Sequence, residues 1–170
     1  LVHAVRRAAR QAQPGYDALC ATVRGSPVVT PDETSWRVAA DLQWLWAFVT
    51  PETTVYAIQP GRGRAQAATV IGADFAGVLV RDGWQSYRQF THAAHQTCLA
   101  HLLRRCRTLL LDYPRQPFVA AVKATLQGAL ATRDAYRTGT VSPHGLAVAR
   151  GHYLARLGRL LRRTPSRRLR

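Results

Sequence analysis

The sequence predicts an α/β fold in which a three-stranded meander, a crossover helix and further strands precede a C-terminal helical extension. Three observations support this prediction. Between residues 28 and 58, apolar and polar side chains tend to alternate, which is typical of strands with one buried face. Residues 77–80 form a short, unbroken apolar run, which favours a strand buried on both faces. Beyond His101, leucines recur at helical spacing along most of the remaining chain.

The length and composition are those of one domain with a substantial core. The chain has 170 residues, contains no Met and begins at Leu1, so we expect both of its ends to be cut. Its three Cys residues form no Cys-x-x-Cys pair, which favours a reducing, intracellular compartment. No apolar run approaches the roughly 18 residues that a membrane span needs, so no membrane partner is expected.

Residues 1–25 predict an N-terminal helical segment. Apolar side chains recur at helical spacing from Leu1 to Ala12, with arginines on the other face. The pair Pro14-Gly15 is expected to break this helix. Residues 17–24 then form a second short helix, or the same helix resumed, before Gly25 ends it.

Residues 26–112 predict the core that contains the sheet. The first strand covers residues 28–38, and Pro31 within it argues against a fully paired central strand. The second strand covers residues 43–50. The alternation places four large apolar side chains on one face: Leu42, Trp44, Trp46 and Phe48. We interpret the two tryptophans among them as core residues.

The rest of this core alternates helices and strands. A β-branched strand is expected at 54–58, and a short Ala-rich helix follows at 64–71. The apolar run at 77–80 is the fourth strand, residues 84–90 predict a short helix, and residues 96–99 predict a weak fifth strand.

The remaining residues, 113–170, predict a basic helical insertion. The net charge is +15 overall, and residues 101–170 account for +13 of it. A basic surplus on one part of a chain indicates a polyanionic partner, most simply nucleic acid. The residues expected to contact DNA are Arg62, Arg64, Trp84, Arg104 and Arg105. For each of them the ordinary alternative is a solvated surface position or a place in the core.

The order of meander, crossover helix and strand is that of the ribonuclease H-like fold. In that arrangement the first and fourth strands are neighbours, so Asp32 and Asp82 can converge at the carboxyl end of the sheet. Asp82 also begins an Asp-Gly dipeptide, and for this stretch alone a turn is the simpler interpretation. Two converging carboxylates suit Mg²⁺ or Mn²⁺ at a phosphodiester better than Zn²⁺.

Five stretches carry a more specific signal when they are taken together. They are 32–38 (DETSWRV), 44–46 (WLW), 60–63 (PGRG), 80–84 (VRDGW) and 95–102 (HQTCLAHL). With these stretches the chain closely resembles the central domain of the insertion-sequence-66 transposases, which are DDE-type enzymes of bacterial mobile elements. The similarity covers essentially the whole chain.

The resemblance implies specific roles for four residues. It implies that Asp32 and Asp82 are the first and second catalytic acids and the metal ligands, with Mg²⁺ or Mn²⁺ as the cofactor. The Cys-x-x-His pair of Cys98 and His101 resembles a motif seen after the second acid in several transposase families, which implies that these two residues support the active site.

The family's third acid, a Glu beyond the helical insertion, has no match in this chain. After Asp82 the only acidic residues are Asp112 and Asp134, and neither fits the family pattern. We therefore expect an incomplete active site here, inactive without further sequence.

The function implied by the resemblance is DNA transposition. The complete enzyme would cut the element ends and join the 3′-hydroxyl to target DNA by two-metal phosphodiester chemistry. The implied partners are the element ends, the target DNA and further copies of the protein in a homo-oligomer. The implied location is the bacterial cytoplasm, in association with the nucleoid. The alternative is a non-catalytic, basic DNA-binding remnant. A ribonuclease acting on RNA hybrids would share the fold, but no feature here indicates recognition of 2′-hydroxyl groups.

Two further groups have competing interpretations. In an extended strand Glu33 points away from Asp32, and a surface role is favoured over a supporting role behind the metal. Four neighbouring residues could be read as a zinc site: His92, His95, Cys98 and His101. They lie in one segment, whereas structural zinc sites usually take ligands from two separate segments. We therefore favour hydrogen bonds from these histidines to nearby backbone.

Overall fold

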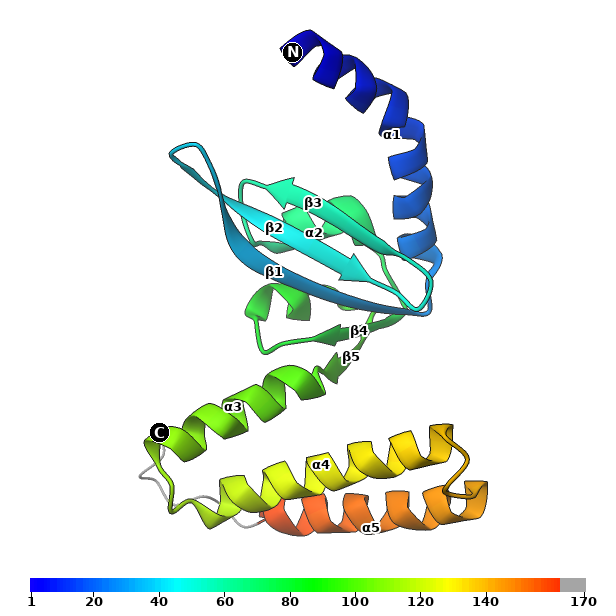
Figure 1. Cartoon of the computed structure of the whole chain (residues 1–170), viewed down its shortest axis with the longest axis vertical. Coiled ribbons are helices and arrows are strands. Elements are labelled where there is room, and N and C mark those ends of the chain that lie inside the picture. The colour runs from blue at the N-terminus through cyan, green and yellow to red at the C-terminus, as the bar shows by residue number, and fades with distance from the viewer. Residues whose placement is uncertain (163–170) are drawn as a thin grey trace. The chain divides into compact units, whose positions relative to one another are not determined.

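The computed structural model describes residues 1–162, which fall into two units (Figure 1). The first unit covers Leu1–Cys98, and the second begins at Leu99. The predicted division at residues 25 and 112 stays a prediction, and residues 163–170 of the predicted basic insertion lie outside the described range. Within residues 1–162, no helix has the length and apolarity needed to cross a membrane.

The first unit combines helices with a five-stranded sheet, and the described part of the second unit, residues 99–162, contains three helices. In chain order the elements are α1 (Val2–Gly25), β1 (Val28–Val38), β2 (Asp41–Val49), β3 (Thr54–Gln59), α2 (Arg64–Ile71), β4 (Val78–Arg81), the 3₁₀ helix η1 (Gln85–Gln89), β5 (Ala94–Thr97), α3 (Leu99–Asp112), α4 (Pro117–Arg137) and α5 (Pro143–Arg162).

The strands lie in the order β3-β2-β1-β4-β5. The first three strands are antiparallel neighbours, whereas β4 runs parallel to both β1 and β5. This is the ribonuclease H-like order that the sequence predicts, with the first and fourth strands side by side.

The core of the first unit lies between the sheet and the two helices α1 and α2. Trp46 and Phe48 are fully buried on the same face of β2, and their rings stack with centroids 5.7 Å apart. Cys20 and Val23 of α1 join this core, as do buried residues of α2. The alternation in residues 43–50 therefore predicts the buried face correctly, although Leu42 at its start is 51% exposed.

The predicted break at Pro14 is wrong. The helix α1 runs without interruption from Val2 to Gly25, with Pro14 inside it, and Figure 1 shows that it curves along its length. Proline costs one helical hydrogen bond, but contacts beyond it compensate. Val23 is buried in the core, and Arg24 donates to the carbonyl oxygens of Val70 and Thr69 at 2.9 and 2.7 Å.

Pro31 lies within β1, and the pairing of that strand explains why it is tolerated. The antiparallel ladder with β2 extends from Thr30 to Val38, and Pro31 lies opposite Phe48. On the other side, β1 pairs with β4 only at Val28 and Val29, so this ladder ends before Pro31. The central strand is incompletely paired, as its proline predicts.

The weak fifth strand begins two residues earlier than the sequence suggests. It spans Ala94–Thr97 rather than residues 96–99, and Ala94 N–H donates to the Gly77 carbonyl oxygen at 3.0 Å. Leu99 belongs to α3 instead, because the apolar stripe that begins there is helical.

Candidate active site at Asp32 and Asp82

The pairing of β1 with β4 brings the two predicted acids to matching positions. The last recorded pair is Val29 with Leu79, and Asp32 and Asp82 each follow three residues later. In adjacent parallel strands, residues at matching positions point to the same side of the sheet. The Asp32 residue is exposed and Asp82 is half-buried, so solvent reaches both positions.

Each of these carboxylates accepts a local backbone hydrogen bond. Asp82 Oδ1 accepts from the Trp84 N–H at 2.7 Å, so this residue does organise a turn, in addition to its place after the strand. Asp32 Oδ1 accepts from the Glu33 N–H at 3.0 Å. Each bond orients its carboxylate locally, for Asp32 within β1 and for Asp82 directly after β4.

Glu33 does not have the predicted surface role. It points away from the face of Asp32, as expected for an extended strand, but its side chain is only 3% exposed. Its carboxylate accepts hydrogen bonds from Arg62 and from the Tyr87 hydroxyl. Burial raises the pKa of Glu33, whereas the bonds from Tyr87 and Arg62 oppose that rise.

The Tyr87 hydroxyl is buried next to Glu33, and this environment changes its pKa. Its pKa is raised far above the usual value, first by burial and then by its bond to Glu33. The charges of Asp82 and Asp32 add to the rise, so both carboxylates act on this one hydroxyl. Two acids that are fifty residues apart in the sequence therefore influence the same small region.

Arg62, predicted to contact DNA, lies inside this region. Its Nε and Nη2 atoms donate to Glu33 Oε1 at 3.2 and 2.9 Å. Its guanidinium carbon lies 3.8 Å from the ring centroid of Trp84 and 4.7 Å from that of Trp44. The guanidinium is therefore extensively occupied by the protein, and its contact with DNA stays a prediction.

The other predicted DNA contacts have different surroundings. Trp84 is 37% exposed, and its indole N–H donates to the Arg62 carbonyl oxygen at 3.1 Å. Arg64 donates to the Ala73 carbonyl oxygen at 3.1 Å and lies 5.3 Å from the Phe90 ring centroid, so it packs against its own unit. By contrast, exposed positions on α3 are occupied by Arg104 and Arg105.

The histidine-rich segment contains no zinc cluster in the described structure. Among residues 1–162, no group of three or more His, Cys, Asp or Glu side chains could hold a metal ion. His95 Nδ1 accepts from Arg81 Nε at 3.1 Å, which leaves Nε2 as the donor to the Phe90 carbonyl oxygen, also at 3.1 Å. The favoured interpretation, a backbone hydrogen bond, holds for His95.

Cys98 and His101 lie on either side of the boundary between the units. Cys98 ends the first unit, and its N–H donates to the Arg81 carbonyl oxygen at 2.7 Å. His101 lies in the first turn of α3, in the second unit. Their supporting role stays a prediction.

The remaining acids of the second unit have exposed positions. Asp112 is the last residue of α3, and Asp134 pairs with the adjacent Arg133 at 2.7 Å. Neither position indicates a metal ligand.

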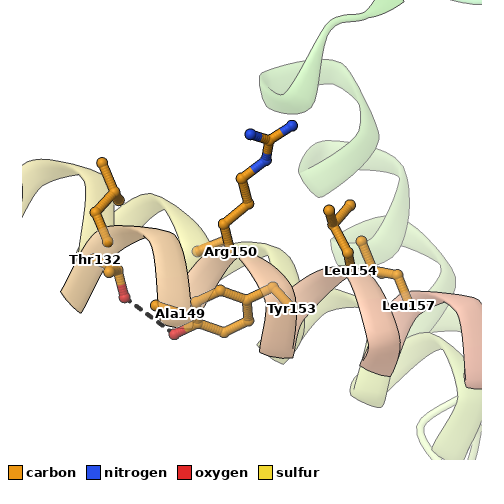
Figure 2. A pocket seen from close by; sticks show the side chains of 8 residues that line it. Thr132, Ala149, Arg150, Tyr153, Leu154 and Leu157 are labelled. Carbon is orange, nitrogen blue, oxygen red and sulfur yellow. Dashed lines mark hydrogen bonds between the residues drawn. The ribbon is translucent and has the colours of Figure 1, made fainter. Parts of the chain in front are cut away.

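One pocket lies beside Asp32 in the first unit, and another lies in the second unit. A shallow pocket of about 130 Å³ adjoins Asp32 and is also lined by Leu45 and Tyr56 of the neighbouring strands. A larger, mostly apolar pocket of about 320 Å³ lies in the second unit, along α4 and α5 (Figure 2). There the Thr132 and Tyr153 hydroxyls lie 3.1 Å apart, and no acidic side chain lines the pocket. Of these two pockets in the described residues, the first adjoins a candidate catalytic group and the second does not.

Sequence reasoning missed the Glu33–Arg62–Tyr87 contacts. In the structure Glu33 lies opposite Trp46, which is fully buried, so the alternation of the strands directs its side chain toward the core. A carboxylate in such a position needs buried partners. Nothing in the local sequence indicates which residues those partners are.

The strand order defines a protein of the ribonuclease H-like class. The family model described as "Transposase IS66 family" matches residues 1–167. The chain therefore belongs to the IS66 transposase family, whose DDE-type members carry out DNA transposition. None of the curated proteins that were compared matches it.

Solved structures of two viral proteins show a slight likeness. One is the HTLV-2 integrase catalytic core domain in complex with magnesium, at 15% identity and a TM-score of 0.33, covering 53% of this chain and 75% of that one. The other is a simian T-cell lymphotropic virus intasome in complex with PP2A regulatory subunit B56 gamma, at 15% identity and a TM-score of 0.34, covering 53% and 43%. Both TM-scores are below 0.5, so the fold assignment rests on strand order and family.

Proposed function

We propose that this chain contains the first two acids of a DDE transposase active site, Asp32 and Asp82. The observation that carries the proposal is their matching position after the paired segments of β1 and β4. Their joint effect on the Tyr87 hydroxyl supports it. The reaction is cleavage at the ends of a mobile element, followed by attack of the freed 3′-hydroxyl on target DNA.

The oxygen donors at this position fit a hard divalent ion, Mg²⁺ or Mn²⁺, better than a softer metal. When bound, such an ion supplies activation of the attacking hydroxyl and stabilisation of the leaving oxygen. Asp32 and Asp82 would hold it through carboxylate oxygens. A third acid, which no residue after Asp82 matches in this chain, would complete the ligand set.

The basic surface would bind the DNA backbone. Arg104 and Arg105 are exposed on α3, so their guanidinium groups are accessible to phosphates. Trp84 and Arg64 are further proposed contacts, because they lie in the same unit as the two acids. The partners are then element-end and target DNA, with assembly of several copies during the reaction.

The test of catalysis is strand transfer with Mg²⁺, in a chain extended to include the third acid. Asp82→Asn should abolish transfer, because it removes a metal-binding oxygen while keeping the side-chain shape. Asp41→Asn, at an exposed carboxylate of β2, is the matched control and should leave transfer unchanged. Full activity of the Asp82→Asn protein would overturn the assignment.

A second function has its own support. The net charge of +13 on residues 101–170 also fits a non-catalytic DNA-binding module. Both functions predict DNA binding, but only the first predicts Mn²⁺ binding that depends on Asp32 and Asp82. DNA affinity that does not change with salt concentration would contradict both.

A further inference from the structure

A series of contacts joins the strand that carries Asp32 to the loop that carries Asp82. Glu33 follows Asp32 in β1, and its buried carboxylate binds Nε and Nη2 of Arg62. The Arg62 guanidinium lies 3.8 Å from the ring centroid of Trp84. The Trp84 N–H in turn donates to Asp82 Oδ1 at 2.7 Å. Arg62 thus lies at the middle of a link between the two acids.

The loop after Asp82 makes further hydrogen bonds to Arg62 and Glu33. The Trp84 indole N–H and the Ser86 hydroxyl donate to the Arg62 carbonyl oxygen, at 3.1 and 3.3 Å. The Tyr87 hydroxyl donates to the second carboxylate oxygen of Glu33. The loop is therefore held both through the backbone of Arg62 and through the ion pair.

These contacts add to the positioning by the sheet, because the hydrogen-bonded ladder ends just before Asp82. The strand β4 ends at Arg81; its pairing with β1 ends at Leu79, and its pairing with β5 continues to Arg81. Asp82 thus lies just beyond the ladder, next to the exposed Gly83. A planar, forked guanidinium can bind a carboxylate with its edge while it stacks on an aromatic ring, and a Lys ammonium cannot do both.

We infer that Arg62 is a positioning residue that sets the Asp82 carboxylate relative to Asp32, through its ion pair with Glu33 and its stacking on Trp84. The inference rests on the proposed function in taking the two carboxylates as one metal site. It concerns the protein's own geometry, however, and can be measured without any metal. It also gives Arg62 a role distinct from direct phosphate binding.

The experiment measures hydrogen exchange of the Trp84 backbone amide by NMR in the metal-free protein. Arg62→Ala should accelerate this exchange at least tenfold, because the Trp84 ring loses its support and the bond to Asp82 weakens. The Val78 amide, which donates to the Pro27 carbonyl oxygen at 2.9 Å, should exchange as in the unchanged protein and so report an intact fold. Unchanged exchange at Trp84 would overturn the inference.

Two further variants separate positioning from charge and from general stability. Arg62→Lys keeps the charge but not the planar fork, and should also accelerate Trp84 exchange at least tenfold; exchange at the unchanged rate would overturn the inference. This variant decides the outcome if Arg62→Ala does not fold. Arg88→Ala removes an equal charge from an exposed position of η1 and should leave Trp84 exchange within twofold. Equal acceleration in Arg88→Ala would also overturn the inference.

Mn²⁺ binding provides the connection to the proposed function. If Asp32 and Asp82 bind the ion, Arg62→Ala should weaken binding several-fold, but add no further loss in a protein that already carries Asp82→Asn. Additive losses would overturn the positioning role. A protein that binds no Mn²⁺ would contradict the proposed function alone, and the exchange of Trp84 would still decide the inference.

Discussion

At the scale of the residue, the buried Tyr87 hydroxyl connects stability to pH. Burial and neighbouring carboxylates raise its pKa above the ordinary value of 10.0. In the unfolded chain the hydroxyl ionises near that value, whereas in the folded chain it stays protonated. Its contribution to stability is therefore fully present below about pH 10 and is lost as the pH rises above that value.

We predict that Tyr87→Phe weakens this pH dependence. Above pH 10, the free energy of unfolding of the first unit should fall less steeply in the variant, by about 1.4 kcal/mol per pH unit. Urea unfolding at pH 8 and pH 11, followed by tryptophan fluorescence, measures it, because all four Trp residues lie in the first unit. Tyr56→Phe, at a residue that is 61% exposed, is the control, and an identical slope in Tyr87→Phe would contradict the prediction.

At the scale of the element, the start of β4 has little space. A Cβ atom added at Gly77 would lie 2.8 Å from the Pro27 carbonyl oxygen and 2.6 Å from Phe75 Cζ. That carbonyl oxygen accepts from the Val78 N–H, so it cannot move without disturbing the entry to the strand. The close approach aligns β4 with β1, and thereby Asp82 with Asp32.

We predict that Gly77→Ala destabilises the first unit by about 1–3 kcal/mol, the usual cost of overpacking. Gly15→Ala is the matched control, because an added Cβ there has no atom within 4 Å and the residue lies in α1. Its stability should stay equal or rise by up to about 1 kcal/mol, since Ala favours helix. Urea unfolding of both variants measures the difference, and equal stabilities would contradict this account of β4.

At the scale of the whole molecule, the charge is distributed unevenly. Of the net charge of +15, residues 101–170 account for +13, and their described part is helical. Phosphate binding by such a surface releases counterions, so the affinity for DNA depends on salt.

We predict that DNA affinity falls steeply with salt and that α3 contributes to the slope. Arg104→Ala and Arg105→Ala should each lower the slope of log affinity against log salt concentration by about 0.9. Arg6→Ala, at an exposed position of α1, removes the same charge and should leave the slope unchanged. Titrations with a labelled duplex at several salt concentrations measure it, and equal changes in all three variants would contradict a localised interface.

Much of the fold follows from local patterns, whereas the surroundings of the site do not. The helix at 64–71 is predicted at its observed bounds, and the alternation in β2 identifies Trp46 and Phe48 as core residues. The break at Pro14 is wrong, because tertiary contacts outweigh a local propensity. Glu33 is misjudged because its partners are 29 and 54 residues away in the sequence.

The most direct test of the central claim is an Mn²⁺ titration of the protein followed by electron paramagnetic resonance. We predict one site that Asp32→Asn and Asp82→Asn each weaken at least tenfold, with little further loss in the double variant, because both carboxylates bind the same ion. Asp41→Asn should leave the titration unchanged. Binding that survives either of the first two substitutions at full affinity would contradict a shared metal site.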